Sequence, residues 1–263
     1  MNRETRQTVR VGEGRNSRDI AVRKREGSGP GLVWLGGFKS DMTGTKAESM
    51  SRFAASNGLT SVRFDYAGHG ESGGEFADHT ISDWVADSLT VFEQLTKGPQ
   101  ILVGSSMGGW IALRLAEILE KSDELSRLAG MLLIAPAPDF THELMQPAFT
   151  NQEREQLNSK GYIEQHSEYS DEPTTITREL IDDGERNRVL HKVINLRCPV
   201  EILQGKNDPD VPYQHAIRAM DCLVGTDISF NLIADGDHRL SRPWDIAKME
   251  SCLERLVQSR PQN

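Results

Sequence analysis

The chain has 263 residues, of which 37% are hydrophobic and 26% charged, proportions typical of one soluble globular domain. Its formal net charge of −9 disfavours nucleic acids and anionic membranes as main partners, because both repel an acidic surface. The N-terminal MNRETRQTVRV lacks the apolar run of a signal peptide, and no window approaches the ~20 apolar residues of a membrane span. Cys198, Cys222 and Cys252 share no close spacing, which predicts free thiols rather than a disulfide framework or zinc site. We therefore expect a cytoplasmic protein.

Strand and helix patterns alternate along most of the chain. Short runs predict a hairpin over residues 7–11 and 20–24, and longer apolar runs predict strands at 31–37, 61–64, 101–105, 131–135, 200–205 and 228–233. Helical periodicity covers 45–56, 80–96, the stretch that follows the 101–105 strand, 212–224 and 243–258. Such alternation predicts an α/β fold, with a mostly parallel sheet covered by helices on both faces.

Residues 138–194 interrupt this alternation. They are polar, rich in Glu, Gln, Asn and Asp, and carry scattered aromatic residues at Phe140, Phe149, Tyr162 and Tyr169. A structureless loop of this length is unusual inside a compact domain. We therefore predict a single domain over residues 1–263 with a small helical cap inserted at about 138–194.

The stretch ILVGSSMGGW (residues 101–110) runs from a buried strand directly into a helix. Gly104-Ser105-Ser106-Met107-Gly108 fits G-x-S-x-G in the strand–turn–helix context that a nucleophile elbow requires. A dinucleotide fingerprint would need glycine at Ser106, and a Walker loop would need Gly-Lys-Ser/Thr. A glycine-rich turn whose serine only caps the helix is the remaining alternative, and the residues downstream decide against it.

Two later loops supply the partners that a serine nucleophile needs, in the chain order Ser, acid, His. Asp208 follows the 200–205 strand, and His238 lies in the loop after the 228–233 strand. Asp210 and Asp237 are nearby competitors for the acid. Asp139, which follows the 131–135 strand, is the more serious rival.

Three stretches carry a closer likeness: LGGFKSDMTGTKA (35–47), RFDYAGHGESGG (63–74) and GPQILVGSSMGGW (98–110). With the elbow and the two downstream loops, the chain resembles the α/β-hydrolase superfamily over nearly its whole length. Within it, the chain is similar to the mitochondrial palmitoyl-protein thioesterase and acyl-glucuronide esterase branch and its bacterial relatives. This resemblance implies hydrolysis of acyl thioesters and esters without a metal or cofactor, on small molecules and also on acylated proteins.

The expected roles follow from this pattern. Ser106 is the nucleophile, His238 the general base, and Asp208 the carboxylate that orients His238, while Ser105 stays structural. The oxyanion hole should use the backbone N–H groups of Met107 and Phe38. Many relatives carry a His-Gly pair at the second donor, where this sequence has Leu35-Gly36-Gly37.

The remaining histidines are weaker candidates. His69 borders the pocket or, more simply, packs in a solvated loop. The others are expected at the surface or in the cap: His79, His142, His166, His191 and His215.

The prediction is a serine esterase or thioesterase. Four aromatic residues either line a slot for the acyl chain or only pack the cap onto the core, and for any one of them packing is the simpler expectation: Phe38, Trp110, Phe140 and Phe149. An amidase or C–C bond hydrolase with the same triad is an alternative. A hydrolase-fold protein that binds ligand without turnover is another, from a different functional class.

Overall fold

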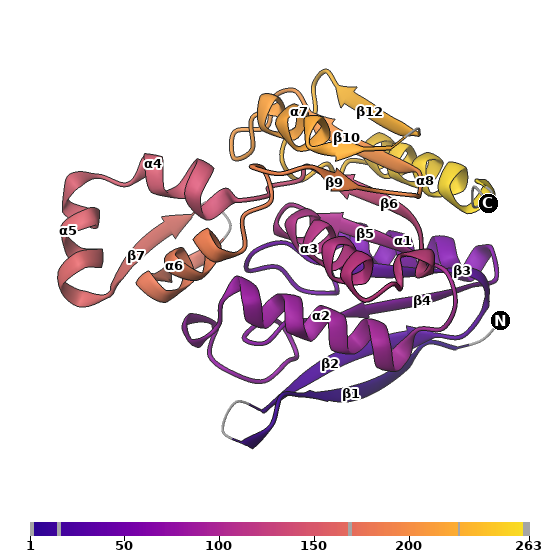
Figure 1. Cartoon of the computed structure of the whole chain (residues 1–263), viewed down its shortest axis with the longest axis horizontal. Helices are drawn as coiled ribbons and strands as arrows, with labels where there is room; N and C mark the ends of the chain where they lie inside the picture. The colour runs from indigo at the N-terminus through magenta and orange to yellow at the C-terminus, as the bar shows by residue number, and fades with distance from the viewer. Residues whose placement is uncertain (1–2, 15–16, 168–169, 226, 260–263) are drawn as a thin grey trace.

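The computed structural model describes residues 3–14, 17–167, 170–225 and 227–259. An eight-stranded sheet runs through the centre, and a separate lobe projects from one side (Figure 1). In spatial order the strands are β1 (Thr5–Val11), β2 (Arg18–Arg25), β4 (Leu59–Phe64), β3 (Ser28–Leu35), β5 (Gln100–Ser105), β6 (Leu128–Ile134), β10 (Val200–Gly205) and β12 (Ile228–Ile233). Strands β4 to β12 pair in parallel, and β1 and β2 join antiparallel at one edge. The mostly parallel sheet and the N-terminal hairpin predicted from the sequence are confirmed.

Two layers of helices cover the sheet. Helices α1 (Thr45–Ser56) and α8 (Pro243–Gln258) pack on one face, and α2 (Ile81–Leu95), α3 (Met107–Lys121) and α7 (Tyr213–Asp221) pack on the other. Two short 3₁₀ turns, Phe76–Asp78 and Leu125–Arg127, complete the connections. Helices α1, α2 and α8 match their predicted ranges to within one residue, and α3 lies in the stretch predicted to be helical. Helix α7 ends three residues before its predicted end because Leu223–Val224 forms a short strand (β11) beside β9 (Ile194–Asn195).

The central strands are buried on both sides because their apolar runs alternate between the two layers. In β3, Leu32 and Trp34 face the α1 and α8 layer, while Val33 and Leu35 face the α2 and α3 layer. Successive strand residues point to opposite faces of a sheet, so a continuous apolar run fills both cores. Because these strands are packed on both faces, their carboxyl ends are held in place. The loops that carry the site begin at those ends.

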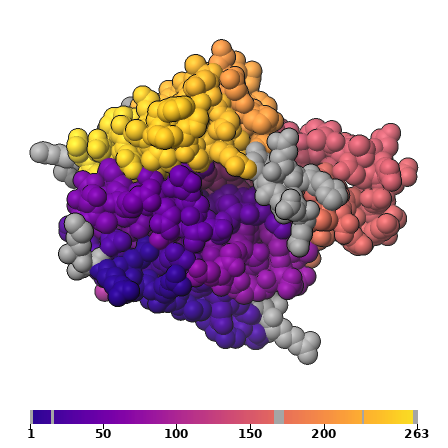
Figure 2. Space-filling model, turned by 180° about the vertical axis from the view of Figure 1, so that it is seen from behind, coloured from indigo at the N-terminus to yellow at the C-terminus, as the bar shows by residue number. Residues whose placement is uncertain are grey.

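The projecting lobe is the inserted cap, and it leaves the sheet after β6 and returns before β10 (Figure 1). It consists of a π-helical turn (Thr141–Met145), α4 (Gln146–Ala148), α5 (Asn151–Lys160), β7 (Tyr162–Ser167), β8 (Ser170–Thr177) and α6 (Arg178–Arg186). The space-filling view shows it standing out from the core (Figure 2).

The predicted helical cap is present but also contains an antiparallel hairpin of β7 and β8, which the prediction lacked. Ile163 and Ile176 are its buried apolar anchors, paired across the two strands, and polar residues surround them. So sparse an alternation gives little strand signal in a polar segment. Tyr169, one of the predicted cap aromatics, lies outside the described residues.

No described helix combines the length and apolar character that crossing a membrane requires.

Candidate active site

The turn between β5 and α3 presents Ser106 in a strained backbone conformation. Its φ of 54° and ψ of −117° are unusual for a residue with a side chain. A methyl group at Gly104 would overlap the Gly108 carbonyl, and one at Gly108 would overlap the Leu35 carbonyl. Glycine at both positions therefore lets strand and helix approach closely enough to hold Ser106 at the tip of the turn.

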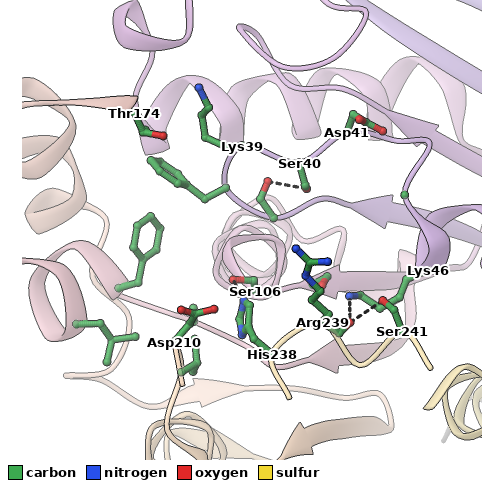
Figure 3. A pocket seen from close by; sticks show the side chains of 18 of the residues that line it. Lys39, Ser40, Asp41, Lys46, Ser106, Thr174, Asp210, His238, Arg239 and Ser241 are labelled. Carbon is green, nitrogen blue, oxygen red and sulfur yellow. Dashed lines mark hydrogen bonds between the residues drawn. The ribbon is translucent and has the colours of Figure 1, made fainter. Parts of the chain in front are cut away.

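The structure brings Ser106, His238 and Asp208 together although they lie far apart in the sequence. Figure 3 shows Ser106 beside His238. His238 Nε2 is 3.1 Å from Ser106 Oγ, and His238 Nδ1 is 2.8 Å from Asp208 Oδ2. Because a carboxylate only accepts hydrogen bonds, Nδ1 carries the ring proton and Nε2 accepts from the serine hydroxyl. This arrangement lets the ring take the hydroxyl proton from Ser106.

Asp208 is buried and held by four donors. Its Oδ1 accepts the backbone N–H groups of Asp210 (2.9 Å) and Val211 (2.8 Å), and its Oδ2 accepts Gln204 Nε2 (3.0 Å) as well as His238. Sequence reasoning missed Gln204. The available signal was a glutamine inside the otherwise apolar strand VEILQG, because a buried amide in a strand has to find partners.

The rival acids have other partners. Asp139 is fully buried and accepts the backbone N–H groups of Val189 (2.8 Å) and Leu190 (2.9 Å), which ties the two ends of the cap together. Asp237 accepts the N–H of Leu240. The hydrogen bonds of His238 thus favour Asp208, as the sequence pattern predicted.

One group of possible metal ligands occurs in the described part of the chain: Asp208, Asp210 and His238 offer ligand atoms within 4.8 Å of one another. The oxygens of Asp208 are already used by two backbone N–H groups, an amide and an imidazole. A cation there would have to displace the hydrogen bond between Asp208 and His238. The donor set therefore fits a hydrogen-bonded triad better than a metal centre.

The loop after β3 lies against Ser106. A methyl group built at Gly37 would be 3.5 Å from the Ser106 Cβ, so the neighbouring Phe38 backbone is next to the serine. The Phe38 backbone N–H donates to no backbone acceptor in the described ranges, and the Met107 N–H is the first of helix α3, where N–H groups have no partner one turn earlier in the helix. Two such N–H groups beside a serine are suited to receive negative charge on a substrate oxygen.

Ser106 and His238 open into a cavity of about 800 Å³ between the core loops and the cap. We call the part next to the cap the apolar arm, because most of its lining is apolar: Phe38, Ala137, Phe140, Leu144, Met145 and Ile176, with the polar Gln165 and Thr174 on the same hairpin as Ile176. The other arm is polar and includes Ser40, Asp41, Lys46, Arg239 and Ser241 (Figure 3). Together they can hold a substrate with an apolar tail on one side of Ser106 and a polar group on the other.

Of the four aromatics considered for an acyl slot, Phe38 and Phe140 line the cavity, and their rings make an edge contact at 5.3 Å. Trp110 is instead fully buried, and its Nε1 donates to the Asn187 carbonyl at 3.0 Å. Phe149 is likewise buried in the core. These two side chains therefore join the cap to the core beneath the cavity.

Two histidines differ from the prediction. His69 is only 4% exposed, so it is not in a solvated loop, and His215 is buried on α7 with its Nε2 2.8 Å from the Pro138 carbonyl. Buried rings next to backbone groups give no distinct sequence signal. The side chain of His166 lies outside the described residues.

Burial lowers the pKa of His69 to about 4, and the positive charge of Lys39 adds to the effect. An unfolded histidine titrates near ~6.5, so between about pH 6.5 and 4 the unfolded chain binds a proton at His69 that the folded chain does not. The His69 contribution to stability is therefore complete above pH 6.5 and is lost as the pH falls.

We expect wild-type protein to lose up to ~1.4 kcal/mol of unfolding free energy per pH unit more than His69→Gln across this window. Urea unfolding of both proteins at pH 7, 6 and 5 measures the difference. His215 titrates in both proteins and cancels. Parallel losses in the two proteins would contradict the assignment.

Comparison with known proteins was consistent across sequence and structure. The model of the "Alpha/beta hydrolase family" matches residues 29–249. Palmitoyl-protein thioesterase ABHD10, mitochondrial, from Bos taurus is 34% identical over 242 residues, covering 91% of this chain and 76% of that protein. The Homo sapiens protein of the same name is 32% identical over 240 residues, with 91% and 76% covered.

Solved structures agree. A putative hydrolase from Agrobacterium vitis S4 has a TM-score of 0.95 and 48% identity, covering 97% of this chain and all of that one. Alpha/beta hydrolase domain-containing protein 10 from mouse has a TM-score of 0.83 and 29% identity, with 95% and 98% covered. The chain therefore belongs to the α/β hydrolase family.

Proposed function

We propose that the protein is a serine hydrolase that cleaves acyl thioesters and esters through an acyl-enzyme on Ser106. The observation that carries this proposal is the hydrogen-bonded series Ser106–His238–Asp208 at the wall of a two-armed cavity. The likeness to palmitoyl-protein thioesterases supports the thioester part. No cofactor takes part in the proposed reaction.

In the first half of the reaction, His238 Nε2 removes the Ser106 proton while Oγ attacks the acyl carbon. Negative charge develops on the carbonyl oxygen, which the N–H groups of Phe38 and Met107 stabilise. The intermediate then expels the thiol or alcohol, with His238 returning the proton. Asp208 keeps the ring in the required tautomer and stabilises its positive charge.

In the second half, water takes the place of the leaving group. His238 removes a proton from this water as it attacks the acyl-enzyme, and the collapse of the second intermediate releases the fatty acid and restores Ser106. We assign the apolar arm to the acyl chain and the polar arm to the leaving group. The polar arm includes the solvent-exposed residues Asp41 and Arg239. A small thiol, an alcohol or an acylated protein side chain suits that position.

Activity should rise with acyl chain length until the apolar arm is full. Each buried methylene contributes about 0.8 kcal/mol at most, so kcat/KM should increase by up to ~4-fold per methylene from acetyl to medium-chain substrates. The measurement is kcat/KM for p-nitrophenyl acetate, butyrate, octanoate and palmitate, beside the matching acyl thioesters. Peptide amides should be cleaved little or not at all.

Leu144→Trp provides a structural check of this series. Leu144 is a half-buried residue of the apolar arm at the edge of the core, so a larger side chain there should shorten the slot, and a thermal melt of the variant checks that the fold is kept. The octanoate to acetate ratio should fall in this variant. A flat or falling wild-type series would remove the acyl slot and leave a small-substrate esterase. A wild-type protein that binds activated esters without releasing product would be the non-catalytic alternative.

The cytoplasmic location stays a prediction. Cell fractionation of the native host tests it directly.

A further inference from the structure

His69 lies between two loops, and both of its ring nitrogens have backbone partners. Nδ1 is 3.1 Å from the carbonyl oxygen of Ala67, and Nε2 is 3.2 Å from the backbone nitrogen of Lys39. The ring makes edge contacts with Tyr66, Phe76 and Trp84, with centroids 5.2–5.6 Å away. His69 is therefore enclosed on its faces and engaged at both polar atoms.

These partners allow one protonation state. The Ala67 carbonyl can only accept, so Nδ1 must carry a hydrogen, and the Lys39 N–H can only donate, so Nε2 must be free of one. The neutral ring with its proton on Nδ1 satisfies both bonds. Protonation of Nε2 would point a hydrogen at the Lys39 N–H and break the contact.

The Lys39 end of this bridge belongs to the loop beside Ser106. Lys39 has a φ of 58°, in the left-handed region that is unfavourable for a residue with a side chain, so the turn needs outside support. Ser40 closes the turn by donating its N–H (3.2 Å) and its Oγ–H (2.9 Å) to the Gly37 carbonyl. Phe38, which lies between Gly37 and Lys39 in this turn, has the N–H assigned above to the oxyanion.

The Ala67 end is anchored in the core. The Ala67 carbonyl also accepts Trp84 Nε1 at 3.1 Å, and the Ala67 N–H donates to Asp87 Oδ2 at 2.9 Å. Asp87 is fully buried and its other oxygen accepts Arg18 Nε at 2.6 Å. A buried, fully bonded segment thus holds one side of the His69 ring, and the ring holds the strained turn.

We propose that His69 is a positioning residue for catalysis: by accepting the Lys39 N–H it fixes the Phe38 N–H toward the oxyanion. This inference rests on the proposed function. It differs from a packing role because it depends on one acceptor atom, Nε2, and not on the volume of the ring.

Two amide substitutions separate the two bonds. The glutamine amide reaches the position of Nε2, so His69→Gln can still accept the Lys39 N–H. The asparagine amide reaches only the position of Nδ1, so His69→Asn keeps the Ala67 contact alone. Loss of a whole oxyanion donor costs ~10²–10³ in kcat, so misplacing one should lower the kcat of His69→Asn by about 10- to 100-fold with KM nearly unchanged. His69→Gln should retain kcat within about threefold.

His79→Gln and His79→Asn are the matched controls, because His79 lies nearby on the same connection with its Nδ1 3.8 Å from Asp83 and away from the cavity lining. Equal losses of kcat in His69→Gln and His69→Asn would show that only packing matters and would overturn the proposal. Wild-type protein without any ester turnover would overturn the proposed function itself, and the inference with it.

A second measurement does not depend on the folding of any variant. Nitrogen-15 NMR of histidine-labelled wild-type protein should show His69 as the neutral ring with its proton on Nδ1 at pH 7. A proton on Nε2 would leave the Lys39 N–H without this acceptor and would overturn the proposal.

Discussion

Replacing Ser106 with alanine should abolish ester and thioester turnover. The hydroxyl is the atom that attacks the acyl carbon, and in a comparable serine-protease triad removal of the serine costs about 2 × 10⁶ in turnover. A fluorophosphonate probe should label wild-type protein once, at Ser106, and should not label Ser106→Ala. Intact-mass spectrometry after labelling and initial rates with p-nitrophenyl butyrate give the two readouts.

Ser105→Ala is the matched control, since Ser105 is the neighbouring residue at the end of β5 and is also buried at the cavity wall. It should keep its single label and most of its activity. Labelling at Ser105, or retained turnover in Ser106→Ala, would mean that the elbow has been misassigned.

Asp208→Asn should keep the fold but lower kcat by about 10⁴, the loss measured for the equivalent change in a known triad. An asparagine amide can offer N–H to His238 Nδ1, which favours the wrong ring tautomer and leaves Nε2 unable to accept the serine proton. The backbone donors Asp210 and Val211 can still bond to the asparagine oxygen, but the amide N–H group then faces the Gln204 donor, so we expect a modest loss of stability with the fold retained. Steady-state kinetics and thermal melts separate the two effects.

Asp139→Asn and Asp210→Asn are the controls for this prediction. Asp139→Asn should lower the melting temperature, because its carboxylate holds the two ends of the cap at Val189 and Leu190, yet it should cost far less activity than Asp208→Asn. Asp210→Asn should likewise cost far less, since its backbone N–H, which bonds Asp208, is retained. A large loss of kcat in Asp139→Asn without loss of fold would mean that Asp139, in the segment after β6, is the carboxylate that orients His238.

The sequence was sufficient for the order of the core elements and for naming Ser106, Asp208 and His238 as candidates, which the fold brings within hydrogen-bond distance. Apolar runs such as MLLIA mark strands because the side-chain period of a strand is local. The G-x-S-x-G spacing marks the elbow because only glycines allow the close approach of β5 and α3. The loops of Asp208 and His238 follow from their place after strands whose carboxyl ends share one edge of the sheet.

The partners across the fold were decided only by tertiary structure. His238 is 30 residues from Asp208 and 132 from Ser106, and several aspartates fit the sequence order. Which one faces the ring depends on how β10 and β12 pair and how the loops after them pack. The hydrogen bond from Gln204 to Asp208 and the one from the Lys39 N–H to His69 also depend on how loops that are distant in sequence pack together.

The cap shows the same division. Its polar composition marked it as an insertion, but its hairpin rests on one buried isoleucine in each strand, too sparse a pattern to indicate strands. Trp110 and Phe149 were candidates for the slot because aromatics near an elbow suit an apolar pocket, yet both are buried against the cap–core junction. The periodicity of a helix or strand depends on residues that are close in sequence. Whether a side chain lines a cavity or fills a core depends on segments that come into contact only in the folded chain.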